Sequence, residues 1–358
     1  IQQQLKPIDI HPGFSLNGST FNKNELKEFA YDYIKEGEPF EREIGLFLSD
    51  WTSQNEFIKV NTSGSTGEPK SIVLKKEHMI NSAIATGRYF NLVSGNSAVH
   101  CLPSNFIAGK MMLVRAMVLG LRLECVPPVS KPLLDSKIAY DFAAMVPLQL
   151  ENSINQIDTI KQLIVGGAPI SRSLKERIQH KKTKIFETYG MTETITHIAV
   201  RQVNFKKDLP FKTLPNIVIK TDSRDCLVID APNITESTVV TNDIVNLISE
   251  TEFEWVGRYD NIINSGGVKL IPEKIETLLA PLLKNRYFIA GIPDELLGQK
   301  IVLVIEGEVD QGMLWDGIRS VNGFTKYQIP KEVLISSGFS VTKNGKIDRT
   351  ETLKSLFN

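Results

Sequence analysis

The chain has 358 residues, a length that predicts two domains more readily than one. Its 41 acidic and 41 basic residues balance, so the composition gives no support for nucleic acid or an anionic membrane surface as a partner. The three cysteines form no Cys-x-x-Cys pair, which argues against a disulfide framework or a zinc site and fits a reducing compartment. The longest apolar stretch, residues 111–123, is too short to span a bilayer. We therefore expect a cytoplasmic protein.

The first two thirds of the chain are predicted to form an α/β domain. Asn22 can cap a helix over residues 22–36 that Gly37 ends, and apolar residues from Phe40 to Trp51 predict a second helix. Beyond a strand at 57–60, helices and strands alternate, which predicts a largely parallel sheet. The helices are expected at 76–90, 108–121 and near 171–180, and the strands at 97–102, 123–126, 141–146, 162–165 and 184–186.

The pattern changes twice in the remainder. From about residue 197, short strands separated by turns predict a small antiparallel subdomain. The last hundred residues predict a compact α+β unit with its own core. We therefore predict an N-terminal domain over 1–258, a small mobile C-terminal domain over 261–358 and a hinge near Asp260. The expected C-terminal elements are helices at 272–283 and near 313–321 and strands at 286–291, 299–306 and 332–336.

The segment after the strand at 57–60 has the composition of an anion-binding loop. Glycines let a backbone close around an anion, and hydroxyls and a lysine donate to phosphate oxygens. It is not a Walker loop, because Glu68 and Pro69 separate Gly67 from Lys70. By itself, such a cluster is more often an ordinary loop than a phosphate site. The candidate ligands are Thr62, Ser63, Gly64, Ser65, Thr66, Gly67 and Lys70.

A second candidate follows the strand at 184–186. It should lie at the carboxyl end of the sheet, where open α/β folds bind ligands. The ring of Tyr189, next to Gly190, can cover an adenine, Thr192 can reach a phosphate, and Glu193 can hold Mg²⁺ directly or through water. The alternative is a turn with a core tyrosine.

Further candidates lie toward the C-terminus. The carboxylate of Asp243 suits the two hydroxyls of a ribose, and Arg258 can bond the same sugar or a phosphate. Gly266 and Gly267 permit a tight turn or the close approach of a ligand, although a plain hairpin would have the same sequence. Lys346 lies in an Asn-Gly turn, where a lysine is normally solvated.

Together and in this order, these segments resemble the adenylate-forming superfamily of acyl- and aryl-CoA ligases, amino-acid adenylation domains and luciferases. The resemblance extends from about residue 57 to the C-terminus. It also includes Gly-Gly-Ala-Pro at 166–169, the Gly-Arg-x-Asp segment at 257–260 and Asn-Gly-Lys-Ile-Asp-Arg at 344–349. It implies an enzyme that joins a carboxylic acid to AMP, using ATP and Mg²⁺, and then transfers the acyl group to a thiol such as that of CoA.

The resemblance implies a role for each matching segment. Residues 62–70 would hold the β- and γ-phosphates. Gly166, Gly167 and Ala168 would lie along one face of the adenine and Tyr189 along the other. Thr192 would contact the α-phosphate and Glu193 would organise Mg²⁺.

For the C-terminal segments, Asp243 and Arg258 would bind the ribose. Asp260 would be the hinge. Lys346 would bridge the carboxylate and the α-phosphate during adenylation, and residues 266–267 would lie beside the pantetheine arm of CoA.

The chain departs from the family pattern in three places. Val341-Thr342 stands where a proline often precedes the terminal lysine segment, which changes the stiffness of the loop more than its chemistry. The phosphate segment begins earlier than is usual, so a shortened N-terminal region is expected. The usual Thr-Gly-Asp reads Thr241-Asn242-Asp243 and retains the aspartate.

In overall length and in the runs at 102–109, 146–150 and 190–194, the chain most resembles, within the superfamily, the o-succinylbenzoate–CoA ligases of menaquinone biosynthesis. Their substrate is an aromatic dianion. Its pocket needs an apolar slot and a donor for the second carboxylate. The run at 104–106 carries no acid, which disfavours an amino-acid substrate. The candidate donors are Ser104, Asn105, Arg115, Thr194, Thr196 and His197.

Several alternatives stay open. Arg115 could belong to an ordinary ion pair, and His197 could be a structural polar group. The protein could be another aryl- or short-acyl-CoA ligase, an adenylating enzyme that loads a carrier protein, or a non-catalytic relative. The expected partners are a small carboxylic acid, ATP and CoA, and the pattern leaves a homo-oligomer open.

Overall fold

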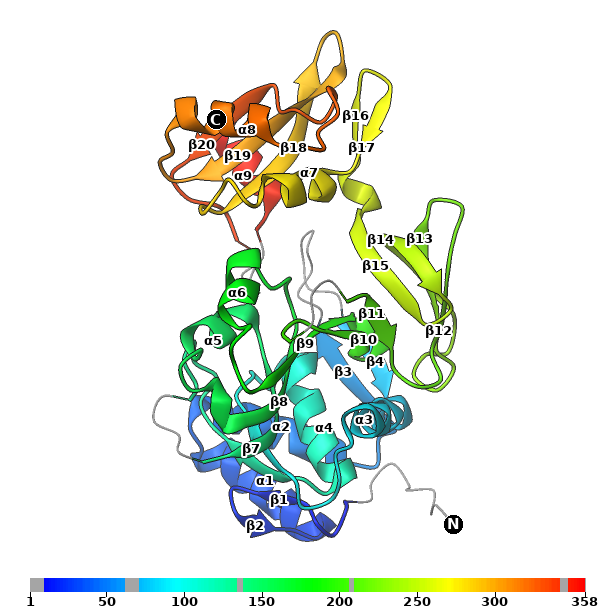
Figure 1. The fold of residues 1–358 in the computed structure, drawn as a ribbon. Coiled ribbons are helices and arrows are strands. Elements are labelled where there is room, and N and C mark those ends of the chain that lie inside the picture. Colours follow the sequence, from blue (N-terminus) through cyan, green and yellow to red (C-terminus); the bar gives the residue numbers. More distant parts are fainter. Residues whose placement is uncertain (1–9, 62–70, 134–137, 206–208, 342–346, 358) are drawn as a thin grey trace. The chain divides into compact units, whose positions relative to one another are not determined.

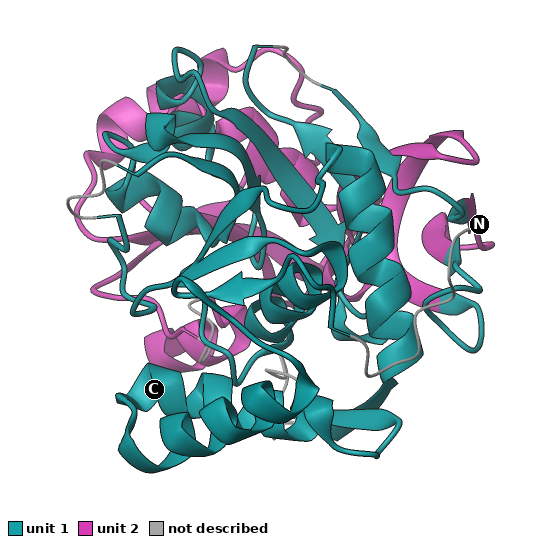
Figure 2. Cartoon of the chain, turned by 90° about the horizontal axis from the view of Figure 1, so that it is seen from below, with its two compact units in different colours: residues 1–218, 229–239 teal, residues 219–228, 240–358 magenta. Residues whose placement is uncertain are grey.

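A computed structural model describes residues 10–61, 71–133, 138–205, 209–341 and 347–357. Contacts divide the chain into two compact units, residues 1–218 with 229–239 and residues 219–228 with 240–358 (Figure 2). Each unit is described by itself. The hinge predicted near Asp260 concerns motion and stays a prediction.

After two short strands, the first unit has two helices whose ends are explained by their hydrogen bonds (Figure 1). Asn22 caps α1 (Lys23–Glu36) by accepting hydrogen bonds from the backbone nitrogens of Asn24 and Glu25, as its sequence predicts. Helix α2 is Pro39–Thr52. Two carbonyl groups at its C-terminal end accept hydrogen bonds from Lys76. The Nζ of Lys76 donates to the carbonyl of Trp51 at 2.8 Å and to that of Ser53 at 3.0 Å.

A mostly parallel sheet forms the centre of this unit. The hydrogen-bonded order is β2-β1-β6-β5-β7-β8-β9-β10-β11. All neighbouring pairs from β1 to β9 are parallel, while β2, β10 and β11 are added antiparallel. The α/β fold with a mainly parallel sheet is therefore confirmed. The strands are β1 Ser15–Leu16, β2 Ser19–Thr20, β5 Ser97–His100, β6 Arg122–Cys125, β7 Tyr140–Met145, β8 Ile160–Val165, β9 Lys184–Gly190, β10 His197–Gln202 and β11 Phe211–Thr213.

The remaining helices of this unit connect or follow these strands. Helix α4 is mostly apolar, and its residues 109–118 are buried, with Lys110 and Arg115 among them, as expected of a helix inside a core. Strands β3 (Phe57–Asn61) and β4 (Ser71–Lys75) form a separate antiparallel pair. The helices are α3 Lys76–Phe90, α4 Ile107–Leu119, α5 Pro147–Asn152, α6 Arg172–Arg177, η1 Ile157–Thr159 and η2 Thr192–Thr194.

The second unit contains two sheets. In the first, β12, β13, β14 and β15 are neighbours in that order. In the second, the order is β17-β16-β19-β18, and β20 pairs with β19 in parallel. The strands are β12 Val218–Thr221, β13 Cys226–Asp230, β14 Val239–Ser249, β15 Glu252–Arg258, β16 Ile263–Ser265, β17 Val268–Leu270, β18 Tyr287–Asp294, β19 Gly298–Glu306 and β20 Glu332–Ser336.

Both faces of the second sheet are covered. Along β19, Ile301, Leu303 and Ile305 belong to one buried cluster, and Val302 and Val304 belong to another. This period of two places alternate residues on opposite faces, as a strand requires. The α+β unit predicted for the last hundred residues is confirmed. Its helices are η3 Tyr259–Asn261, α7 Pro272–Leu279, α8 Gln311–Ser320 and α9 Arg349–Phe357.

None of the helices in the described ranges is long and apolar enough to traverse a bilayer.

Candidate active site

The predicted phosphate segment, residues 62–70, lies outside the described residues, but the strands on either side of it are described. In the β3–β4 pair, Asn61 lies directly opposite Ser71. The described strands are thus paired up to the last residue on either side of the segment.

At the carboxyl edge of the parallel sheet, the segments after β8 and within β9 are in contact. The backbone nitrogen of Gly166 donates to Met145 at 3.1 Å, and the hydroxyl of Thr188 donates to the carbonyl of Val165 at 3.2 Å. A Cβ on Gly166 would come within 2.4 Å of the Thr188 hydroxyl, so this position has room only for glycine. Gly167 has φ +84°, a conformation that favours glycine, and is exposed. The predicted adenine residues 166–168 thus lie beside Thr188, which precedes Tyr189.

The run from Tyr189 ends β9 and forms a tight turn. Tyr189 is half-buried, with its ring centroid 6.0 Å from that of Phe211. Gly190 has no space for a side chain, because a Cβ would meet the carbonyl oxygen of Thr196 at 2.2 Å. Thr192 is half-buried and Glu193 is exposed, so both are accessible to a ligand.

The next residues explain the shape of this turn. The hydroxyl of Thr194, which is buried, donates to Met191 at 3.0 Å and to Thr196 at 2.9 Å. Ile195 has φ +65°, a strained conformation for a β-branched side chain, and the backbone nitrogen of Thr196 donates to the Thr194 carbonyl at 2.7 Å. Thr194 therefore stabilises the turn, and its predicted contact with substrate stays a prediction, as does that of Thr196.

Glu187 of β9 is a residue to which the sequence pattern assigned no role. Its carboxylate is buried and pairs with Lys175 at 3.0 Å and Arg201 at 2.7 Å. It also accepts a hydrogen bond from the backbone nitrogen of Ile170 at 2.8 Å. Burial alone would raise the pKa of Glu187, but Arg201, Lys175 and this N–H together lower it. The carboxylate is therefore charged, and it joins the loop after β8 to β9.

Two of the predicted substrate residues lie just before α4. Ser104 is buried and its hydroxyl lies 2.8 Å from Nε2 of His100, whereas Asn105 is exposed. Burial lowers the pKa of His100 to about 4, so this imidazole is neutral. Ser104 thus has a buried partner of its own, and its contact with substrate stays a prediction.

The other two, Arg115 and His197, contact each other in the interior. Arg115 of α4 donates through its NH2 atom to Nδ1 of His197 at 3.4 Å, and Nε2 of His197 lies 3.4 Å from the Thr86 hydroxyl. The Thr86 hydroxyl donates to the carbonyl of Ser82 at 3.0 Å, which leaves its oxygen free to accept from Nε2–H. Burial, followed by the charge of Arg115, lowers the pKa of His197, so the ring is neutral.

Within the described part of the chain, Arg115 is a buried cation without an acidic partner. Its exposed fraction is 1%, and among the described residues no carboxylate lies within 4.0 Å and its Nε has no hydrogen-bond partner. Burial lowers the pKa of Arg115 to about 9, which still leaves it charged at neutral pH. A buried charge normally has a counter-ion, since desolvation of an unpaired charge is costly. The hydrogen bond from Arg115 goes to the neutral ring of His197, so it does not offset this charge.

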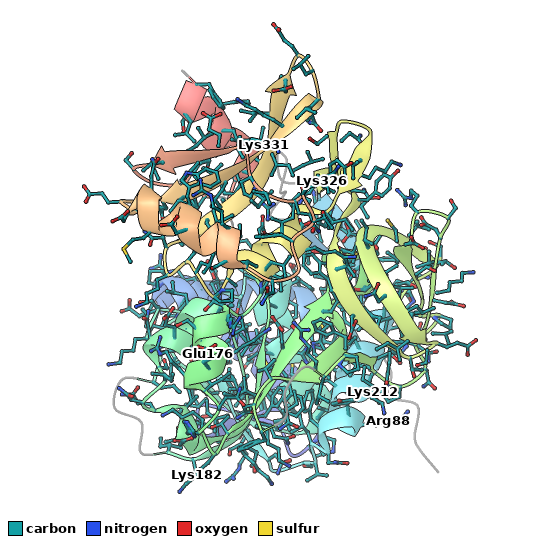
Figure 3. All side chains as sticks on the ribbon, turned by 45° about the horizontal axis from the view of Figure 1, so that its top comes forward. Arg88, Glu176, Lys182, Lys212, Lys326 and Lys331 are labelled. Atoms are coloured by element: carbon teal, nitrogen blue, oxygen red, sulfur yellow. The ribbon has the colours of Figure 1, made fainter. Side chains whose placement is uncertain are left out.

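A cavity of about 120 Å³ lies within the first unit, and Arg115 is not among the residues that line it. His197 lines it, as does Ser82, whose buried hydroxyl has no partner among the described residues. Arg88, labelled in Figure 3, is an exposed residue of its lining. The other lining residues are Asn81, Ile84, Ala85, Leu214, Pro215, Asn216, Ile217, Ala231, Asn233 and Ile234.

In the second unit, the two predicted ribose residues are brought together. Asp243 of β14 lies directly opposite Arg258 of β15, and NH1 of Arg258 is 3.6 Å from Oδ1 of Asp243. The indole nitrogen of Trp255 donates to the same oxygen at 3.1 Å. Asp243 is buried while the Arg258 side chain is 44% exposed, so a ligand can reach the guanidinium. The sequence alone does not indicate that Trp255 contacts Asp243. It also does not indicate the strand register that places Asp243 opposite Arg258.

Gly266 and Gly267 form the turn of the β16–β17 hairpin. Their φ angles are +58° and +80°, and Ser265 pairs with Val268, as in a two-residue turn that favours glycine at both positions. A Cβ on Gly267 would meet nothing within 4 Å. The hairpin is confirmed, whereas contact with a pantetheine arm stays a prediction.

Lys346 lies outside the described residues, and the residues that flank its segment are anchored. Val341 and Ile347 form an antiparallel bridge. Arg349 pairs with Glu276 of α7 at 2.9 Å and lies 3.8 Å from Glu273.

Comparison with known proteins gives the family. The model of the AMP-binding enzyme family matches residues 60–230. A crystal structure of an acyl-CoA synthetase (AMP-forming)/AMP-acid ligase II-like protein from Dyadobacter fermentans is 34% identical, with a TM-score of 0.61, over 92% of this chain and 98% of that chain. The chain therefore belongs to the AMP-binding enzymes, as a member of the AMP-forming acyl-CoA synthetases. The adenylate-forming resemblance is confirmed.

Other similar proteins carry a more specific name. The 2-succinylbenzoate–CoA ligase of Bacillus cereus is 21% identical over 92% of this chain and 76% of its own length. The o-succinylbenzoate CoA synthetase of Bacillus subtilis, solved with its acyl-adenylate intermediate, has a TM-score of 0.73 at 20% identity and covers 95% of this chain and 78% of that chain. At this identity, the structural likeness supports the two-domain fold.

Proposed function

We propose that the protein adenylates a carboxylic acid with ATP, releases pyrophosphate and transfers the acyl group to the thiol of CoA. The observation that carries the proposal is the contact between residues 166–168 and the end of β9, because it brings a glycine-lined backbone and an accessible aromatic ring to the ligand-binding edge of a parallel sheet. In the second unit, Asp243 and Arg258 form a carboxylate and guanidinium pair that suits the ribose hydroxyls.

Magnesium fits this site as a partner of the nucleotide. Within the described ranges, no group of three His, Cys, Asp or Glu side chains could hold a metal ion by itself. Mg²⁺ commonly uses one or two carboxylates together with phosphate oxygens. Glu193, exposed at the turn after β9, would be its protein ligand, and the ion would neutralise charge on the phosphates.

The protein's own residues would supply the remaining chemistry. Attack of a carboxylate on a phosphate brings two anions together, so cations and donors must offset the charge that grows at phosphorus. Thr192 would donate to the α-phosphate, and Lys346 would lie between the two anions. The phosphate segment, with Lys70, would hold the departing pyrophosphate.

We further propose that the acid is o-succinylbenzoate, an aromatic dicarboxylate. The buried guanidinium of Arg115, which has no carboxylate partner among the described residues, supports an acid with a second negative charge. The relatives named above carry this substrate in their names. His197 would hold Arg115 in place through its Nδ1 while its Nε2 bonds to the Thr86 hydroxyl. The hydroxyl of Ser82 would be a further hydrogen-bond donor to the acid.

Pyrophosphate release with a panel of acids, with and without CoA, tests both parts. We expect ATP-dependent turnover of o-succinylbenzoate and formation of its CoA thioester. Turnover of benzoate-like monocarboxylates alone would overturn the proposal that o-succinylbenzoate is the substrate. It would leave the proposed ligase reaction standing. Release of AMP and pyrophosphate without any CoA thioester would point to a carrier protein as the acceptor. Failure to bind ATP would overturn the whole proposal.

A further inference from the structure

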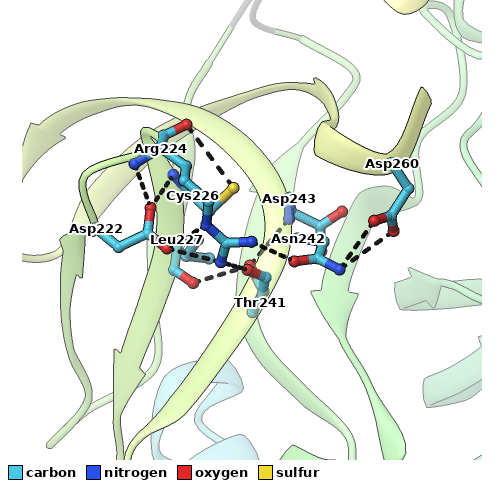
Figure 4. A network of polar contacts seen from close by, with 8 residues as sticks. All are labelled: Asp222, Arg224, Cys226, Leu227, Thr241, Asn242, Asp243 and Asp260. Carbon is cyan, nitrogen blue, oxygen red and sulfur yellow. Dashed lines mark hydrogen bonds and ion pairs between the residues drawn. The ribbon is translucent and has the colours of Figure 1, made fainter. Parts of the chain in front are cut away.

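Asn242 of β14 is the central link of a polar network in the second unit (Figure 4). Its amide nitrogen donates to the two carboxylate oxygens of Asp260 at 3.1 and 3.3 Å, and its amide oxygen accepts from NH1 of Arg224 at 2.9 Å. A carboxylate only accepts and a guanidinium only donates, so these two neighbours fix the orientation of the amide.

Arg224 is itself held in place. Its Nε donates to Oδ2 of Asp222 at 2.9 Å, and its NH2 lies 2.7 Å from the same oxygen. The NH2 atom also donates to the carbonyl of Thr241 at 3.2 Å, and the guanidinium lies 5.1 Å from the ring of Tyr259. Arg224 therefore provides Asn242 with a fixed anchor.

On the other side, Asp260 competes with Asp243 for one guanidinium. NH2 of Arg258 lies 2.9 Å from Asp260, whereas NH1 of Arg258 lies 3.6 Å from Asp243. The position of Asp260 thus decides how Arg258 is oriented beside Asp243. Asn242 is the residue that connects Asp260 to the anchored Arg224.

We propose that Asn242 is a positioning residue for ribose recognition. It holds Asp260, which in turn keeps Arg258 oriented next to Asp243. The inference rests on the proposed function, in which Asp243 and Arg258 bind the ribose. The superfamily pattern has glycine at this position, and glycine has no side chain with which to make the link, so the device depends on this chain's own residue.

The test compares a nucleotide that has ribose hydroxyls with one that lacks them. Calorimetry would give the affinities of the wild-type protein and Asn242→Ala for AMP and for 2′,3′-dideoxy-AMP. We expect Asn242→Ala to bind AMP about tenfold more weakly, as for a lost hydrogen bond to a charged group. The affinity for the dideoxy nucleotide should change less than about twofold, because that ligand makes no contact through its ribose hydroxyls.

Asn246→Ala is the matched control. Asn246 lies on the same strand and its amide also donates to a carboxylate, that of Glu254 at 3.4 Å, but it is outside the network. This variant should bind both nucleotides like the wild type. Equal losses for the two nucleotides in Asn242→Ala, or no loss for either, would overturn the inference.

Arg224→Met tests the anchor. It should also weaken AMP binding selectively, and the double variant Asn242→Ala/Arg224→Met should bind no more weakly than the worse single variant, because both changes break one path. Additive losses would contradict a shared path. A wild-type protein that does not bind AMP would instead overturn the proposed function, and this inference with it.

Discussion

Glu187 of β9 accepts a hydrogen bond from the backbone nitrogen of Ile170 at 2.8 Å and thereby connects two segments of the nucleotide edge. Residues 166–168 come just before Ile170, and Tyr189 comes just after Glu187. One carboxylate, held by Lys175 and Arg201, therefore fixes the two segments between which the adenine is predicted to lie.

Replacing this carboxylate should cost stability. Glu187→Gln keeps an oxygen for Ile170 but leaves Lys175 and Arg201 without their anion. We expect a loss of about 2–3 kcal/mol in the free energy of unfolding, below the usual range for breaking a buried pair because both cations are partly exposed. Urea denaturation measures it. Glu151→Gln, which breaks the exposed pair with Arg177, should cost less than about 1 kcal/mol. Equal losses in the two variants would contradict the assigned role.

The same residue predicts a pH dependence. Burial alone would raise the pKa of Glu187, but Arg201, Lys175 and the Ile170 N–H hold it below its usual 4.5. A carboxyl whose pKa is lower in the folded state stabilises the fold above the unfolded pKa, and this stabilisation is lost as the pH falls through the folded pKa. The free energy of unfolding of the wild type should therefore decrease below about pH 4.5, and the decrease should be smaller in Glu187→Gln. Parallel curves for the two proteins would show that Glu187 does not titrate in this way.

Arg115→Met tests the second carboxylate of the substrate. We expect kcat/KM for o-succinylbenzoate to fall about 10- to 150-fold, the value of one hydrogen bond to a charged group. A monoester that lacks the second charge should be affected less than about twofold. Pyrophosphate release measures both. Arg122→Met, which removes an exposed arginine bonded to the carbonyl of Gly95, is the control.

Stability separates this role of Arg115 from a structural one. Replacing an unpaired buried charge by an apolar side chain of similar size should leave the free energy of unfolding unchanged or raise it. A large loss of stability in Arg115→Met, with substrate preference unchanged, would assign Arg115 to the core instead.

Lys346→Ala should separate the two half-reactions. We expect adenylate formation to fall at least about 100-fold, by analogy with removal of one oxyanion donor. Thioester formation from a supplied acyl-adenylate should be nearly unaffected, because that step no longer needs a cation between two anions. Single-turnover assays of each half-reaction measure this. Lys354→Ala, on the exposed surface of α9, is the control, and equal loss of both half-reactions in Lys346→Ala would reject the division.

Gly267→Leu should mainly impair the thiol step. The side chain would project from the open turn of the β16–β17 hairpin, and φ +80° would add about 1–2 kcal/mol of strain. Gly267→Asn, which tolerates this conformation, controls for strain, and Gly338→Leu adds the same side chain at another open position. An unchanged rate of thioester formation in Gly267→Leu would show that the turn does not line the route of the thiol.

Local signals explain which parts of the fold could be predicted from the sequence. Asn22 with Glu25 marks the start of α1, the apolar run of α4 marks a buried helix, and the paired glycines mark the β16–β17 turn. Each depends on residues close together in the chain. Helices α5 and α9 were not predicted, and α5 has only six residues, too few to show a helical period.

The contacts of the site depend on register and on distant segments. The ion pairs of Glu187 come from α6 and β10, and the amide of Asn242 meets Asp260 only because β14 and β15 align as they do. A shift of one residue in that register would turn these side chains to the other face. The sequence therefore indicates which residues are candidates for binding and catalysis. The residues that orient them can be identified only from the fold.

The hydrogen bond from Trp255 to Asp243 gives this enzyme a built-in optical reporter. The chain has three tryptophans, and of the other two, Trp51 of α2 is buried while Trp315 of α8 is half-buried and packs against a core cluster. In the proposed complex, a ribose bound by the carboxylate of Asp243 would change the hydrogen-bond partner of the half-buried Trp255 indole. Nucleotide titrations can therefore be followed by intrinsic emission, with Trp255→Phe as the silent variant, without attaching any dye.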